Sequence, residues 1–115
     1  NLSLGFSYNK SIELNENLKH VCLGNKFNQP IKLNKNLIRL NLGYNFNQPI
    51  ILNESLEELT LYGIHMYEIN FNNKIITINI SNLNSKFKKY LTEKFIILKT
   101  YQMAPILISY ELKNI

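Results

Sequence analysis

A repeat of 19 residues constrains the fold of this chain more than any other feature. When the sequence is shifted by 19 residues against itself, apolar residues fall into five columns. The columns are Leu2, Val21, Leu40, Leu59 and Ile78; Leu4, Leu23, Leu42, Leu61 and Ile80; Ile12, Ile31, Ile50 and Ile69; Leu14, Leu33, Leu52 and Phe71; and Leu18, Leu37, Leu56 and Ile75. So short a unit cannot bury its apolar face alone, and the repeats must stack into a solenoid with one continuous core.

Each repeat contains two runs in which apolar residues alternate, such as Leu40-x-Leu42 and Ile50-x-Leu52. Alternation with a period of two predicts two short strands per repeat, with glycine and proline marking the turns between them. Helical repeats need roughly 33 residues or more and do not fit. We therefore predict an all-β or mostly β protein, a parallel β-solenoid resembling leucine-rich repeats, with coils about 4.8 Å apart.

The repeat register predicts about six coils in a single domain over residues 1–115. Residues 1–80 form regular coils, residues 81–95 form a divergent coil, and residues 96–115 form a sixth coil. In the sixth coil, apolar residues and a proline recur at the same distances from Leu98 as they do from Leu42 in an earlier coil. In the divergent coil, aromatic and apolar residues recur at helical spacing and predict a short helix. These residues are Phe87, Tyr90, Leu91 and Phe95.

Two copies of one pentapeptide lie within the regular coils. Phe27–Ile31 and Phe46–Ile50 both read FNQPI, and each follows a Leu-Gly pair. In these motifs the chain resembles the FNIP repeat family. That family is similar to leucine-rich repeats, occurs in social amoebae and giant DNA viruses, and often follows an F-box. The resemblance implies a protein-interaction role, and a part in substrate recognition by a ubiquitin ligase.

Residue types that carry catalysis are sparse. Cys22 is the only cysteine, which excludes an internal disulfide and fits an intracellular, cytoplasmic protein. His20 and Cys22 could be half of a metal site, but the chain has no aspartate, and nothing completes four ligands. Glu57 and Glu58 are adjacent and point to opposite faces of a strand, so they cannot act as a catalytic pair. We expect a protein that is not an enzyme and needs no cofactor or metal.

Asparagines form two columns of their own. Because they recur in every coil, we expect structural roles, with the amides hydrogen-bonding the turn backbone and each other between coils. Ligand binding by these amides is the alternative. The columns are Asn15, Asn34, Asn53 and Asn72, and Asn9, Asn28 and Asn47.

The columns beside the inward leucines of the first strand vary from copy to copy. They should project outward from a continuous sheet, and solenoids commonly bind partners through such a face. The alternative is a plain solvated surface with an Arg39–Glu58 pair between coils. The predicted face comprises His20, Arg39, Glu58 and Thr77 in one row, and Cys22, Asn41, Thr60 and Asn79 in the next.

The net charge of +5 is concentrated at the C-terminal end, where residues 81–115 hold six lysines and two glutamates. The cluster Lys86, Lys88, Lys89 and Lys94, with aromatics nearby, makes nucleic-acid binding a rival function. A purely structural spacer is a third possibility. No apolar run is long enough for a membrane span. We expect the partner of such a solenoid to be another protein.

Overall fold

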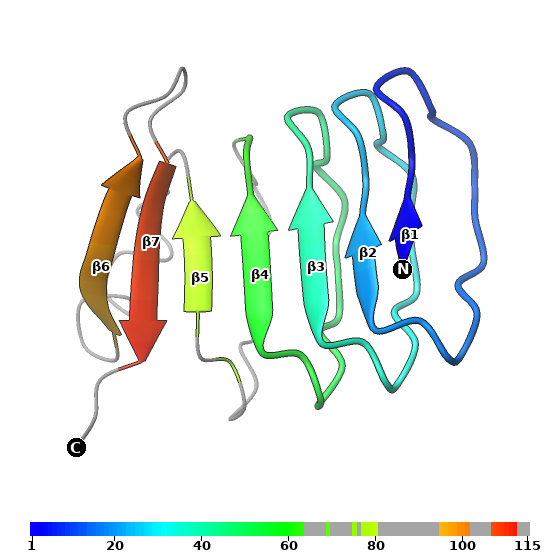
Figure 1. Cartoon of the computed structure of the whole chain (residues 1–115). Coiled ribbons are helices and arrows are strands. Elements are labelled where there is room, and N and C mark those ends of the chain that lie inside the picture. Colours follow the sequence, from blue (N-terminus) through cyan, green and yellow to red (C-terminus); the bar gives the residue numbers. More distant parts are fainter. Residues whose placement is uncertain (64–68, 70–74, 76, 81–94, 102–106, 113–115) are drawn as a thin grey trace.

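The computed structural model describes residues 1–63, 69, 75, 77–80, 95–101 and 107–112. Five short parallel strands lie side by side, one from each successive repeat (Figure 1). They are β1 (Leu2–Ser3), β2 (His20–Cys22), β3 (Arg39–Leu42), β4 (Glu58–Leu61) and β5 (Thr77–Ile80). From β1 to β4 the chain returns behind the sheet between strands, and the five strands bound about four turns of a solenoid.

Strand pairing follows the 19-residue register at every step. Leu40 on β3 pairs with Val21 on β2 and with Leu59 on β4, and Leu59 pairs with Ile78 on β5. Each partner lies 19 residues away, so the period of the sequence equals one turn of the solenoid. The predicted parallel β-solenoid is confirmed.

Within residues 1–63, the second strand predicted in each repeat does not form. Residues 50–52 show the expected alternation, because Ile50 and Leu52 are buried while Ile51 is 89% exposed. However, this stretch is not a strand. Alternation reports which side chains are buried, whereas a strand also needs a ladder of backbone hydrogen bonds. Pro49 opens the stretch without an N–H to donate. Each described turn therefore holds one strand and an extended return stretch.

The prediction that residues 96–115 form a sixth parallel coil is wrong. β6 (Phe95–Tyr101) and β7 (Leu107–Leu112) pair antiparallel, and β7 also pairs antiparallel with β5. The sheet order is β1-β2-β3-β4-β5-β7-β6, so parallel stacking ends at β5. Phe95 opens a strand, and the rest of the predicted helix in residues 81–94 lies outside the described residues. Alternating residues predict a strand but leave its direction open.

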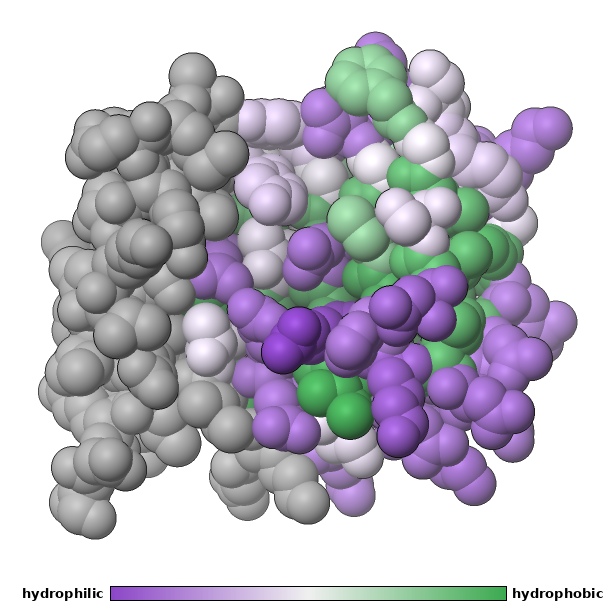
Figure 2. All heavy atoms as spheres, in the orientation of Figure 1, coloured by the Kyte–Doolittle hydropathy of each residue, from purple (hydrophilic) through white to green (hydrophobic). Residues whose placement is uncertain are grey.

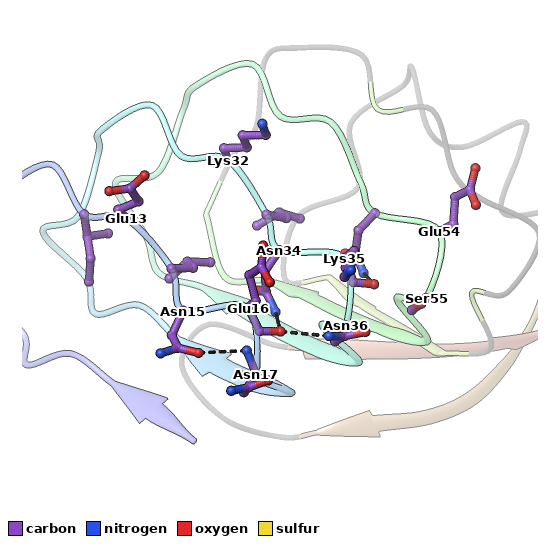
Figure 3. Close-up of a pocket in the computed structure, with 14 residues that line it drawn as sticks. Glu13, Asn15, Glu16, Asn17, Lys32, Asn34, Lys35, Asn36, Glu54 and Ser55 are labelled. Carbon is purple, nitrogen blue, oxygen red and sulfur yellow. Dashed lines mark hydrogen bonds between the residues drawn. The ribbon is translucent and has the colours of Figure 1, made fainter.

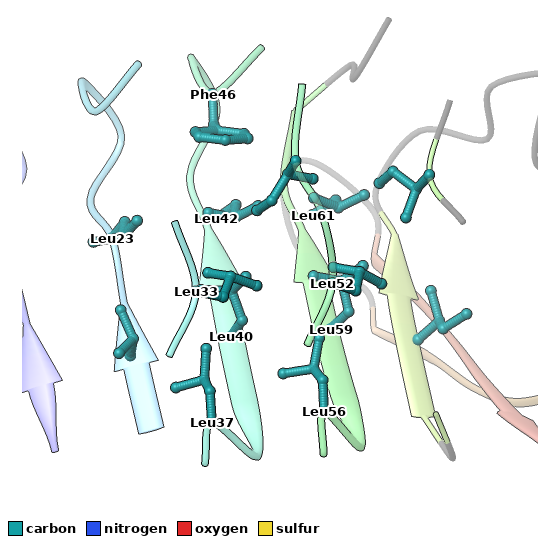
Figure 4. Packing of buried hydrophobic residues seen from close by; sticks show 14 of the residues in the cluster. Leu23, Leu33, Leu37, Leu40, Leu42, Phe46, Leu52, Leu56, Leu59 and Leu61 are labelled. Carbon is teal, nitrogen blue, oxygen red and sulfur yellow. The ribbon is translucent and has the colours of Figure 1, made fainter. Parts of the chain in front are cut away.

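The core lies between the sheet and the return stretches, where side chains of the same column stack from coil to coil (Figure 4). Leu40 and Leu42 in the third coil are fully buried. Their equivalents in the first coil, such as Leu2 and Leu4, are only partly buried against this cluster. Burial therefore deepens from the first coil toward the middle of the stack.

The glycines after the inward leucines allow this close stacking. A Cβ added to Gly43 would lie 2.5 Å from the carbonyl oxygen of Gly24, and one added to Gly24 would meet the carbonyl of Gly5. Real Cβ atoms do not come so near a backbone oxygen. The Leu-Gly pair is thus a packing requirement of adjacent coils.

Candidate functional site

The asparagine of the FNQPI motif forms a ladder along the stack. The Oδ1 atom of Asn9 accepts hydrogen bonds from the backbone N–H of Asn28, at 2.8 Å, and from Nε2 of Gln29, at 3.1 Å. One coil further, Oδ1 of Asn28 accepts from the N–H of Asn47, at 2.9 Å, and from Nε2 of Gln48, at 3.1 Å. This side-chain ladder joins adjacent coils in the turns that follow the strands.

The aromatic residue of the same motif stacks beneath this ladder. The rings of Tyr8 and Phe27 lie 6.4 Å apart and nearly parallel, and those of Phe27 and Phe46 lie 6.2 Å apart. Phe27 and Phe46 are buried. The Phe-Asn-Gln segment of the motif is therefore accounted for by contacts between coils.

The second asparagine column also bonds to the preceding coil. Nδ2 of Asn34 donates to the carbonyl of Leu18 at 2.7 Å, and Nδ2 of Asn53 donates to that of Leu37 at 2.7 Å. Asn15 instead accepts from the N–H of Asn17, at 2.8 Å. These are the backbone contacts expected of structural residues. The fourth member of the column, Asn72, lies outside the described residues.

A broad groove follows this second column along the loops that lead into the strands (Figure 3). Its walls mix amides with charges of both signs, including Glu13, Glu16, Glu54, Lys32 and Lys35. The labelled carboxylates point in different directions (Figure 3). Across the described part of the chain, no three His, Cys, Asp or Glu residues gather in a way that could hold a metal ion.

The outward face of the sheet brings the predicted partner-facing residues into one row. His20 pairs with Arg39, Arg39 with Glu58, and Glu58 with Thr77. Nε of Arg39 lies 3.1 Å from Oε2 of Glu58, with side chains 60% and 32% exposed. An ion pair this open to water contributes about 0–1 kcal/mol to folding stability. Its importance here is that it orients the guanidinium.

The second row of the predicted face, which runs from Cys22 to Asn79, is less exposed to solvent than predicted. Cys22 and Asn41 are partly exposed, but Thr60 and Asn79 are buried, at 4% and 8% exposed. Nδ2 of Asn79 donates to Oγ1 of Thr60, at 2.9 Å, and to Oε1 of Glu58, at 3.3 Å. These two residues support the row beside them and are not open to a partner. Register places a residue on a face, but it does not show how deeply the residue lies there.

Two tyrosines beside this face were missed in the sequence analysis. The rings of Tyr44 and Tyr62 lie 6.2 Å apart, and Tyr44 is 40% exposed. Burial raises the pKa of the Tyr62 phenol, and nearby Cys22 and Tyr44 raise it further. A signal was present in the sequence, because Tyr62 occupies the column that holds glycine in the earlier coils, as at Gly43.

Figure 2 shows the molecule from the same side as Figure 1, with hydrophilic residues spread across the middle of the described surface. The face therefore suits polar contacts, and the exposed ring of Tyr44 beside it adds an aromatic one. Within the ranges that the structure describes, no helix is long and apolar enough to cross a membrane.

Comparison with known proteins identifies the repeat. No curated protein and no solved structure matches the chain. The FNIP Repeat family model matches residues 27–63, which include both copies of FNQPI. Residues 27–63 therefore carry an FNIP repeat, as the FNQPI motifs indicated.

Proposed function

We propose that this chain is a non-catalytic scaffold that binds another protein through the outward face of β2–β5. The binding face is defined as His20, Cys22, Arg39, Asn41, Glu58 and Thr77, with Tyr44 and Tyr62 beside it. One observation carries the proposal. Most of each coil repeats the same side chains in contacts between coils, whereas this face holds a different side chain in each coil. Contacts between coils do not require that variation, and solenoids commonly bind partners through such a face.

The residues on the face suit this role. Arginine and tyrosine are enriched among the side chains that dominate binding energy at protein interfaces. Arg39 is held by Glu58, and Tyr44 lies against Tyr62, so both are partly ordered before a partner arrives. Less conformational entropy is then lost on binding.

The size of the face favours a segment of a partner over a whole domain. Four strands, β2–β5, each three or four residues long and about 4.8 Å apart, give a sheet face of roughly 240 Å². Stable interfaces between globular proteins bury about 800 Å² on each partner. An extended segment lying across the strands matches the smaller area.

The family resemblance supports a finer proposal, in which the bound protein is a substrate presented to a ubiquitin ligase. Loss of ubiquitination of a bound protein in cells, on substitution of the binding face alone, tests this role. Unchanged ubiquitination would reject the ligase role and leave the scaffold in place.

Binding through the face is tested by affinity capture with matched variants. Asn41→Arg places a large charged side chain on the face, and Ile51→Arg places the same side chain on the return stretch, where Ile51 is 89% exposed. A protein captured by the wild type is identified, purified and titrated against each variant. We expect Asn41→Arg to lose binding and Ile51→Arg to retain it. Equal binding by both variants would reject the face as the interaction site.

A further inference from the structure

Arg39 is oriented so that part of its guanidinium stays available. Nε is paired with Oε2 of Glu58, whose other oxygen accepts a hydrogen bond from Nδ2 of Asn79. Glu58 is thereby held from two sides and fixes the arginine. The Arg39 side chain is 60% exposed, so a ligand can reach the guanidinium from the solvent side.

The charges around Arg39 are unequal on its two sides. On the β2 side, the register partner of Arg39 is His20, which carries no negative charge. On the β4 side lies Glu58, the carboxylate that pairs with Nε of Arg39. An anion is therefore attracted to Arg39 on its His20 side and is repelled by Glu58 on the β4 side.

We propose, building on the proposed function, that the binding face selects an extended partner segment bearing an Asp or Glu side chain. That carboxylate lies between Arg39 and His20. The planar guanidinium offers two parallel donors, which match the two oxygens of a carboxylate. The small area of the face confines the partner to a segment, and Tyr44 and Tyr62 contact residues of the segment further along the strands.

The test is fluorescence anisotropy with two labelled peptides, one alternating Glu and Ser and the other alternating Gln and Ser. We expect the Glu peptide to bind more tightly, and Arg39→Gln to weaken it about tenfold, as loss of a charge-assisted hydrogen bond predicts. Arg39→Lys keeps the charge but loses the fork, and should restore only part of the affinity. Lys32→Gln removes the same charge from the return stretch and should change affinity less than about twofold.

Equal affinity for the two peptides, or equal losses in Arg39→Gln and Lys32→Gln, would overturn the inference. This failure differs from failure of the proposed function. If an identified protein partner still loses binding in Asn41→Arg while the Glu peptide does not bind, only the carboxylate site is wrong. If that partner also binds Asn41→Arg as tightly as the wild type, both proposals are rejected.

Discussion

Replacing single leucines of one column with alanine tests how the core is built. Leu42 is fully buried and stacks between Leu23 and Leu61, which are 2% and 3% exposed. Leu42→Ala removes apolar contacts on both sides and leaves a cavity, so it should cost about 2–5 kcal/mol of folding stability. Leu4 occupies the same column but is only partly buried against the core. Leu4→Ala should therefore cost less than half as much.

Urea unfolding followed by circular dichroism measures both losses, with wild-type chain in parallel. The two variants make the same chemical change in the same column, so their difference reports depth in the stack. Total stabilities of domains are about 5–15 kcal/mol, so the loss at Leu42 shifts the midpoint strongly. Equal losses at the two positions would refute a linear stack whose burial deepens away from the first coil.

Other predictions concern the ladder, the close approach of coils, the tyrosine and the lysines. Asn28→Ala removes the acceptor of two hydrogen bonds and should cost about 1–3 kcal/mol in the same unfolding assay, whereas a loss near zero would exclude a structural ladder. Gly43→Ala should destabilise the chain by about 1–3 kcal/mol, while Gly5→Ala, whose Cβ would contact nothing within 4 Å, serves as the tolerated control. The pKa of Tyr62 is raised in the folded state, so its contribution to stability is complete below about pH 10 and is lost as pH rises through the folded pKa. Unfolding midpoints measured across this alkaline range should fall less in Tyr62→Phe than in the wild type. An equal fall in both proteins would contradict a raised pKa of Tyr62 in the folded state. Titration with labelled RNA should show only weak binding that falls steeply with salt, and submicromolar binding abolished by replacing the four lysines between residues 86 and 94 with alanine would revive the nucleic-acid function.

The sequence predicted the stacked architecture because period and register are carried by many residues at once. Leu40, Leu59 and Ile78 each support the same 19-residue spacing, and their pairing follows it directly. The C-terminal strands were placed in the wrong direction because Ile96 and Leu98 alternate equally well in parallel and antiparallel pairs. Periodicity alone does not distinguish these pairings.

The candidate site was predicted in its register but not in its depth. His20, Arg39 and Glu58 form one row as expected, since strand spacing alone decides which residues are neighbours. The burial of Thr60 and Asn79 depends on how short polar side chains settle against each other and their surroundings, which no repeat pattern records. Those contacts exist only once the coils are stacked.

Site-specific photo-crosslinking tests the central claim, that the outward face binds a protein, most directly. A photoreactive phenylalanine analogue replaces Asn41 on the face in one sample and Ile51 on the return stretch in another. Both positions are accessible to solvent, although Asn41 only partly so. The account predicts that an identified partner crosslinks through position 41 and not through position 51. Crosslinking through position 51 alone, or equally through both, would contradict it.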